Sequence, residues 1–299
     1  MNARTLLVTG GSGRLARHVI EHVLERGDDR VVTTTRTPER VADLRDRGVE
    51  VRRVDFDDDE SDVARALEGA DRMLLISTHA VGRRGAQQGK VVRAAELAGV
   101  SHLLYTSATS PAPTPMSAIV SDHFWTELAI FRSDLSWTIL RHNMYSEHVF
   151  LFLPTALAAG ELRTSLGDGA RAYVTRADCA AADAAALMAD WTDRRIYDIG
   201  GPEALRVEDL LSIAEGLTGR AVRHIPVDDE TALRALADSG LPPGFPEAAL
   251  GFDVWARMGH HAIVTPAVRE LTGREPQSLR DYLAEHLDTL LAGTATIDL

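Results

Sequence analysis

The fold is decided by the stretch TLLVTGGSGRLARHVIEHVLERG, residues 5–27. Its first five residues are typical of a buried strand, and residues 14–27 place apolar side chains at helical spacing before a closing glycine. The turn GGSG at residues 10–13 lets the backbone approach a diphosphate, whose charge the free N–H groups of the following helix can bind. A glycine turn alone is also compatible with a purely structural role. Its place between the first strand and the first helix favours dinucleotide binding.

Six short apolar runs alternate with amphipathic stretches through the first half of the chain. This alternation predicts an α/β fold, namely a Rossmann-type doubly wound parallel sheet with helices on both faces. The runs cover residues 5–9, 30–35, 49–54, 72–77, 102–106 and 137–140, and the helical stretches cover 14–27, 38–47, 60–68 and 84–99. Proline-rich residues 110–115 can continue neither a helix nor a central strand, so we expect a surface loop there.

Composition and charge exclude several classes of partner. The 299 residues are 45% hydrophobic and carry a formal net charge of -12, so the average field repels nucleic acid and anionic lipid. No apolar run reaches the roughly 20 residues of a membrane span. Cys179 is the only cysteine, which fits a reducing compartment. We therefore expect a cytoplasmic protein that binds neither nucleic acid nor membrane.

The end of the second strand run selects between dinucleotides. An NAD site usually has an acidic residue there for the ribose 2′-hydroxyl, whereas an arginine accommodates a 2′-phosphate. Arg36 stands at this position and Arg40 follows one helical turn later, with no acid at the strand end. The alternative is a solvated surface arginine. The pattern favours NADP(H).

Further cofactor contacts are expected where the next strand runs end. Asp55 can accept from the adenine amino group and Phe56 can cover the base, although Asp55 is also the start of an acidic surface run. Ser77, Thr78 and His79 end the fourth run, where they can border the ribose and nicotinamide. In the glycine turn and the first helix, the predicted contacts are Gly10, Ser12, Gly13, Arg14 and Leu15.

The regular alternation fails after Arg141. We predict an NADP(H)-binding Rossmann domain at residues 1–149 and a smaller C-terminal α+β cap at residues 150–299, which binds substrate and returns some strands to the main sheet. Helices are expected at 146–159, 177–190, 207–217, 229–238 and 278–290, and strands near 171–174, 195–199 and 222–227.

A common catalytic pair is absent from the sequence. Many enzymes with this cofactor domain use Tyr-x-x-x-Lys, in which the lysine lowers the pKa of the tyrosine. Lys90 is the only lysine, and Ala86 stands four residues before it. Catalysis must therefore rest on hydride positioning with a weaker proton donor or with water.

Polar residues that follow the sixth strand run are the candidates for the acceptor site. Asn143 and Tyr145 lie there and can orient a carbonyl, although a helix N-terminus with ordinary capping is an alternative interpretation. His123 is a further catalytic candidate by position, and each histidine is also compatible with a structural role. No spacing in the chain predicts a metal site.

These motifs carry a family resemblance over nearly the whole chain. TGGSG at 9–13, VDF at 54–56, YTS at 105–107, RHNMYSE at 141–147 and TRAD at 175–178 resemble the NmrA-like atypical short-chain dehydrogenases. The branch most similar is that of type 2 NAD(P)H:quinone oxidoreductases and triphenylmethane-dye reductases. By position, the resemblance implies that Gly10, Gly13, Arg36, Asp55 and Ser77 contact NADPH and that Asn143 and Tyr145 line the substrate pocket.

Two features depart from the family pattern. His142 and Met144 replace the small and aromatic residues expected beside Asn143, and the loop at 111–115 is richer in proline. Both border the expected pocket, so they bear on the choice of acceptor rather than on the fold.

Two function classes follow from this resemblance. The first is an NADPH-dependent oxidoreductase that passes hydride to a small aromatic or quinone-like acceptor. The second is a non-catalytic NADP(H) sensor that acts through a protein partner. A sugar-nucleotide epimerase is disfavoured, because that chemistry normally needs the absent pair. A homodimer is one expectation for the assembly, and the sequence leaves the oligomeric state open.

Overall fold

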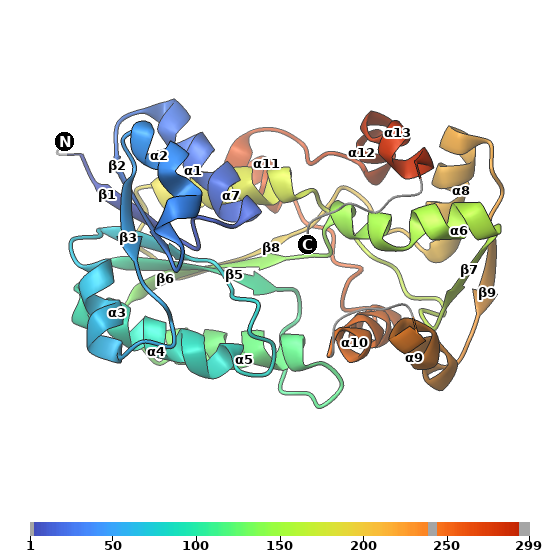
Figure 1. Ribbon diagram of the computed structural model, residues 1–299, viewed down its shortest axis with the longest axis horizontal. Helices are drawn as coiled ribbons and strands as arrows, with labels where there is room; N and C mark the ends of the chain where they lie inside the picture. The colour runs from blue at the N-terminus through green and yellow to red at the C-terminus, as the bar shows by residue number, and fades with distance from the viewer. Residues whose placement is uncertain (1–2, 239–243, 293–299) are drawn as a thin grey trace.

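A parallel sheet of seven strands forms the centre of the computed structural model, which describes residues 3–238 and 244–292 (Figure 1). Its order is β3-β2-β1-β4-β5-β6-β8. The strands are β1 (Thr5–Thr9), β2 (Arg30–Thr35), β3 (Glu50–Arg53), β4 (Arg72–Leu75), β5 (His102–Ala108), β6 (Ser136–His142) and β8 (Arg195–Ile199). The strand order reverses between β1 and β4, and sheets of this kind bind ligands outside the carboxyl ends of the strands at such a point. The predicted Rossmann-type doubly wound sheet is confirmed.

Two helical layers cover the faces of this sheet (Figure 1). One layer contains α1 (Arg14–Arg26), η1 (Pro38–Val41), α2 (Ala42–Asp46), α7 (Arg176–Met188) and α11 (Ala267–Thr272), and the other contains α3 (Glu60–Leu67), α4 (Arg84–Leu97) and α5 (Ala118–Phe131). Successive side chains of β1 point to opposite faces of the sheet. Leu6 and Val8 pack on the α1 side, and Leu7 packs on the α4 side. Covered faces explain why the strands are apolar almost throughout.

Two elements from the second half of the chain belong to this central sheet and its layers. Strand β8 pairs in parallel with β6, and α7 packs against α1. Arg72, at the start of β4, donates to the carbonyl oxygens of Ala186, Leu187 and Trp191 at 2.8–3.2 Å. Burial lowers the pKa of Arg72 to about 10. A buried guanidinium thus satisfies carbonyl groups at the C-terminus of α7 and fixes this helix on the sheet.

The remaining elements form a smaller region at the right of Figure 1. It contains η2 (Ser146–Leu151), α6 (Leu153–Ala159), β7 (Glu161–Thr164), α8 (Val207–Thr218), β9 (Arg223–Pro226), α9 (Asp229–Asp238), α10 (Phe245–Arg257), α12 (Leu279–Glu285) and α13 (Leu287–Leu291). Strands β7 and β9 form a separate parallel pair. Phe150, Leu210 and Leu283 belong to the apolar core of this region.

Two expectations about elements differ from the structure. The strand predicted at residues 171–174 is wrong: Arg171 bridges to Leu205 and Val174 to Tyr145, so neighbouring residues pair with different segments and no ladder forms. Helix α5 lacked a sequence signal. Its apolar residues surround the axis, so they show no helical contrast, and Trp125 is left 50% exposed.

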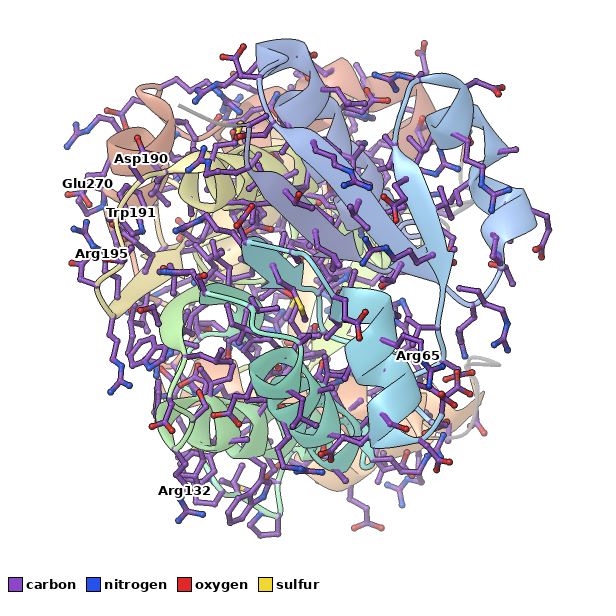
Figure 2. All side chains as sticks on the ribbon, turned by 90° about the vertical axis from the view of Figure 1, so that its left-hand side faces the viewer. Arg65, Arg132, Asp190, Trp191, Arg195 and Glu270 are labelled. Carbon is purple, nitrogen blue, oxygen red and sulfur yellow. The ribbon has the colours of Figure 1, made fainter. Side chains whose placement is uncertain are left out.

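Figure 2 looks onto the amino edge of the sheet, where helices end and strands begin. The side chains labelled there are Arg65, Arg132, Asp190, Trp191, Arg195 and Glu270. The guanidinium of Arg195 stacks over the ring of Trp191 at 4.7 Å. These groups lie at the edge opposite to the carboxyl ends of the strands. In the described part of the chain, no helix has the length and apolar character needed to cross a bilayer.

Candidate functional site

The glycine turn packs closely against β2. Gly10 has φ of 71° and its carbonyl accepts from the Gly13 N–H at 2.7 Å. A Cβ at Gly11 would lie 2.3 Å from Thr33 Oγ1, and the Gly11 N–H donates to the Thr34 carbonyl at 3.0 Å. Gly13 is the N-cap of α1 and has no side-chain capping bond. The turn therefore presents the amide end of a helix without a side chain to cover it, which fits the diphosphate of a dinucleotide.

The neighbouring predicted contacts differ in what they can offer. The Ser12 hydroxyl accepts from the Thr35 hydroxyl at 3.3 Å. Arg14 is exposed in the first turn of α1. The side chain of Leu15 is 8% exposed and belongs to the apolar core, so only its backbone can meet a cofactor.

The cation predicted to bind the 2′-phosphate lies directly after β2. Arg36 is exposed, and within residues 3–238 and 244–292 the structure gives it neither a hydrogen-bond nor an ion-pair partner. Nearby, the Arg40 carbonyl accepts from Arg17, which also pairs with Asp43 at 2.6 Å. The guanidinium of Arg36 is therefore available to an anionic ligand.

The loop after β3 is ordered by its own carboxylates. Asp55 Oδ1 accepts from the Asp57 N–H at 3.1 Å, and the Asp55 N–H donates to Asp58 Oδ2 at 2.9 Å. Phe56 is half-buried and packs against the core on the α4 side. These contacts fix the loop after β3 next to the carboxyl end of β2.

Threonine hydroxyls tie the loop after β4 to its neighbours at the switch point. Thr9 Oγ1 accepts from the Ile76 N–H at 2.9 Å, and Thr106 Oγ1 accepts from the Ser77 N–H at 3.0 Å. The Thr78 N–H donates to Gln88 Oε1 at 3.0 Å. The loop after β4 is thus held to β1, β5 and α4.

Burial and arginine side chains from three elements lower the pKa of His79, at the end of this loop. Partial burial, followed by the charges of Arg84, Arg36 and Arg176, lowers the pKa of His79 below its ordinary value. The imidazole is therefore neutral at pH 7. These arginines belong to α4, the end of β2 and α7, so together they favour an anion at the carboxyl edge.

The cofactor-binding candidates share one edge of four adjacent strands. The turn at 10–15 follows β1, Arg36 follows β2, residues 55–56 follow β3 and residues 77–79 follow β4. These strands are consecutive in the sheet order β3-β2-β1-β4. The acceptor-site candidates lie apart from them, beyond β6 and on α5.

The side chain of Asn143 is occupied by backbone groups. Its Nδ2 donates to the carbonyl oxygens of His261 at 3.0 Å and Ile263 at 3.4 Å, and its Oδ1 accepts from the Met144 N–H at 2.8 Å. Asn143 is buried and holds the segment at 261–263 against the end of β6. A direct role in orienting an acceptor stays a prediction.

Tyr145 belongs to a chain of side chains that the sequence did not reveal. Its hydroxyl lies 2.9 Å from His142 Nδ1, and His142 Nε2 lies 2.8 Å from Asp183 Oδ1 on α7. The tyrosine is half-buried, and the Arg176 guanidinium lies 5.2 Å from its ring centroid. Burial raises the pKa of Tyr145 well above its ordinary value, so the hydroxyl stays protonated.

His123 forms a second buried chain, on the other face of the sheet. Its Nδ1 lies 2.7 Å from the Tyr105 hydroxyl, and its Nε2 lies 3.1 Å from Arg84 Nη1. Burial and the charge of Arg84 lower the pKa of His123 well below its ordinary value. Both ring nitrogens are engaged and the side chain is buried. Its predicted catalytic role stays a prediction.

A buried ion pair lies beside these chains. Glu127 of α5 is bound by Arg141 through Nε at 2.9 Å and Nη2 at 2.6 Å, and it also accepts from the Ser107 hydroxyl at 2.7 Å. This bidentate contact joins the carboxyl ends of β5 and β6 to α5.

Asp183 is the residue that sequence reasoning missed most completely. It lies in the middle of α7, where the residues that flank it are alanines and several of them are buried. The available signal was a carboxylate inside the run CAAADAAAL at residues 179–187, because an aspartate is almost never fully buried without a partner. In the described ranges, no group of three or more His, Cys, Asp or Glu side chains could hold a metal ion.

Comparison with known proteins identifies the family. A family model described as NAD(P)H-binding matches residues 10–190, from the glycine turn to the end of α7. The chain belongs to this NAD(P)H-binding family. The predictions of an NADP(H)-type cofactor and of an NAD(P)H-dependent oxidoreductase are confirmed.

Individual relatives are similar over almost their whole length. Quinone oxidoreductase 2 of Escherichia coli (strain K12) is 31% identical over 280 residues, 93% of this chain and 97% of that protein. The solved structure of the NADPH-dependent Escherichia coli enzyme with NADPH has a TM-score of 0.89 at 30% identity, covering 95% of this chain and 99% of that one.

Two further similarities confirm the family resemblance. The triphenylmethane reductase of Citrobacter sp., solved with NADP(H), has a TM-score of 0.85 at 26% identity, covering 94% of this chain and 99% of that one. An NmrA-like family domain-containing oxidoreductase of Aspergillus flavus is 28% identical over 291 residues, 94% of each chain.

Proposed function

We propose that this protein transfers a hydride from NADPH to a quinone or a similar conjugated acceptor in the cytoplasm. The observation that carries the NADPH preference is Arg36, an exposed guanidinium at the end of β2, one strand away from the glycine turn. The names of the relatives, a quinone oxidoreductase and a dye reductase, support an aromatic acceptor.

The cofactor-binding residues have separate roles in this proposal. The amide groups of the turn at 10–15 bind the diphosphate, and Arg36 binds the 2′-phosphate. Asp55 and Phe56 hold the adenine, while the loop at 77–79 borders the ribose and nicotinamide. NADPH, when bound, supplies the hydride.

The acceptor lies near the end of β6 in this proposal, with Tyr145 as the group that contacts it. Asn143 acts there by fixing the backbone through its contacts to His261 and Ile263. The chain contains no Tyr-x-x-x-Lys pair, so the tyrosine is not activated by a lysine.

Steady-state NADPH oxidation tests the proposal against a panel of benzoquinones, naphthoquinones and triphenylmethane dyes. We expect at least one acceptor to accelerate NADPH oxidation. The control is Gly13→Val, whose branched side chain would crowd the Gly10 carbonyl, because even a Cβ would lie 3.2 Å from that oxygen. This variant should lose NADPH binding while its far-UV circular dichroism stays that of the wild type.

The same assay separates the enzyme from the sensor. If the wild-type protein binds NADPH tightly and no acceptor accelerates its oxidation, the reductase proposal is wrong. A redox sensor that acts through a protein partner would then be the better account.

A further inference from the structure

A carboxylate, an imidazole and a phenol form a continuous hydrogen-bonded chain beside the end of β6. Asp183 comes from α7, His142 is the last residue of β6, and Tyr145 precedes η2. The two links measure 2.8 Å and 2.9 Å. The side chain of His142 is 4% exposed and that of Asp183 is 0% exposed.

Burial makes the charged form of Asp183 unfavourable unless His142 pairs with it. Burial raises the pKa of Asp183, and the contact with His142 opposes that rise. Among the residues that the structure describes, Asp183 Oδ2 has no hydrogen-bond partner. A buried carboxylate costs several kcal/mol unless it is paired and hydrogen-bonded. The hydrogen bond from His142 therefore decides whether the carboxyl group of Asp183 is charged.

The carboxylate also determines where the histidine carries its proton. Asp183 accepts from His142 Nε2–H, so a neutral His142 offers the lone pair of Nδ1 to the Tyr145 hydroxyl. A protonated His142 donates from Nδ1 instead, and the Tyr145 hydroxyl is then free to donate elsewhere. The protonation state of His142 thus sets the direction of the tyrosine O–H.

Other ionisable groups face this chain and share its electrostatics. Glu147 and Cys179 oppose ionisation of Tyr145, and Arg176 favours it. His148 lies 5.5 Å from the Tyr145 ring, between ring centroids. Across the sheet, a charge on His142 lowers the pKa of His123. Asp183 is the carboxylate in direct contact with His142, so its removal should change the behaviour of the chain most.

We propose that His142 and Asp183 are positioning residues that act through Tyr145 to deliver the proton accompanying hydride transfer. This inference rests on the proposed function. The acceptor oxygen takes the phenol proton of Tyr145, and the tyrosine oxygen takes the Nδ1 proton of protonated His142. His142 is left neutral, with its Nε2–H still donated to Asp183. One hydride and one proton complete the two-electron reduction of a quinone to a hydroquinone, and solvent reprotonates His142.

The test is the pH dependence of kcat for wild type and for Asp183→Asn. Asparagine keeps the shape and can accept from Nε2–H, but it lacks the charge that stabilises protonated His142. Loss of a contacting opposite charge typically moves a titration by about 1–3 units. We expect the fall of kcat with rising pH to begin at least about one unit lower, and kcat above that midpoint to drop about 10-fold or more. The Kd for NADPH should not change.

A second readout does not depend on turnover. Nitrogen-15 NMR of His142 should show its titration midpoint moving down in Asp183→Asn by the same interval as the pH–rate profile. Cys179→Ala is the matched control, because Cys179 lies one turn earlier on α7, is also buried, and carries no charge in the pH range of the assay, since burial raises the pKa of its thiol well above the ordinary value. It should leave both midpoints unchanged.

The possible failures are distinguishable. An absence of turnover in the wild type contradicts the proposed function. A wild type that turns over, with an Asp183→Asn variant whose pH profile and His142 titration both match it, contradicts the relay alone. If Asp183→Asn does not fold, Tyr145→Phe replaces it: the variant should lose the pH dependence of kcat, and retention of the wild-type profile overturns the relay.

Discussion

Two tyrosine–histidine pairs lie on opposite faces of the same sheet, and each is bound to a third, charged side chain of opposite sign. The first chain is Tyr105, His123 and Arg84, and the second is Tyr145, His142 and Asp183. In both, histidine Nδ1 meets the tyrosine hydroxyl and Nε2 meets the charged group. The comparison therefore shows how the sign of that charge sets which histidine nitrogen donates and which accepts.

The cation and the carboxylate impose opposite polarities. An arginine only donates, so His123 accepts at Nε2 and must donate from Nδ1 to Tyr105. The positive charge and burial keep His123 neutral, through a pKa well below the ordinary value. The carboxylate of Asp183 instead accepts from Nε2 and stabilises a protonated His142. Tyr105 is also fully buried, whereas Tyr145 is half-buried. Only the second chain is suited to pass a proton to a ligand.

The largest expected effect comes from replacing each histidine by glutamine. Glutamine can place its amide near the Nε2 position and keep the contact with the charged partner, while the contact to tyrosine is lost. Proton transfer by a positioned side chain contributes about 100-fold or more, so His142→Gln should lower kcat by up to about that factor. His123→Gln should leave kcat within about 2-fold and cost roughly 1 kcal/mol of stability.

These two variants are compared by steady-state kinetics and chemical denaturation. A well-folded His123→Gln protein that has lost its turnover would show that His123 is catalytic, and the contrast between the two chains would fail.

Removing each tyrosine hydroxyl should give an effect that depends on the acceptor. For acceptors that need a proton, Tyr145→Phe should lower kcat about as far as His142→Gln does, and it should lower kcat less where solvent can protonate the product. Because His142 acts through Tyr145, the double variant with His142→Gln should lose no more than the single variants. Tyr105→Phe leaves a buried N–H without its acceptor, which should cost about 1–3 kcal/mol of stability with kcat unchanged. If the losses of kcat in Tyr145→Phe and His142→Gln add up in the double variant, His142 does not act through Tyr145.

The smallest effect concerns stability against pH. Burial, together with the positive charge of Arg84, holds the pKa of folded His123 well below its ordinary value. Unfolded histidine binds a proton near pH 6.5, so the unfolded state gains protons first as the pH falls. Stability should therefore decrease below about pH 6.5, by up to about 1.4 kcal/mol per pH unit for each such histidine.

Three further histidines, buried or half-buried, contribute with the same sign. Burial lowers the pKa of His102 and of His148 to about 4, and that of His261 to about 3. Denaturation between pH 7 and 5 should show a steeper loss for wild type than for His123→Gln, which lacks one of these groups. Equal slopes would contradict a neutral buried His123.

The cofactor side of the molecule could be predicted because position alone determines it. In a doubly wound sheet, the segments after β1, β2, β3 and β4 meet at one edge whatever their side chains are. The order of strands was therefore enough to place the glycine turn, Arg36, Asp55 and Ser77 at one edge, and their contacts with the cofactor stay predictions. Local spacing carries this information.

The proton chain could not be predicted because it depends on long-range packing. His142 and Asp183 are 41 positions apart, and their contact requires α7 to pack on the sheet beside β6. The sequence predicts Asn143 as an acceptor-orienting group because it follows β6, whereas in the structure its amide nitrogen donates to the backbone carbonyl groups of residues 261 and 263. A sequence shows which groups are polar, but the tertiary fold decides which partners occupy them.

Calorimetric titration of NADPH and NADH into wild type and Arg36→Ala tests the central claim, that Arg36 at the end of β2 makes this an NADPH-selective site, most directly. Hydrogen bonds to a charged group contribute roughly 1.5–3 kcal/mol, so Arg36→Ala should weaken NADPH binding by about 10–100-fold. NADH binding should stay nearly unchanged, and wild type should bind NADPH more tightly than NADH. Equal losses for both dinucleotides, or a wild type that prefers NADH, would contradict the assignment of Arg36 and the NADPH dependence that rests on it.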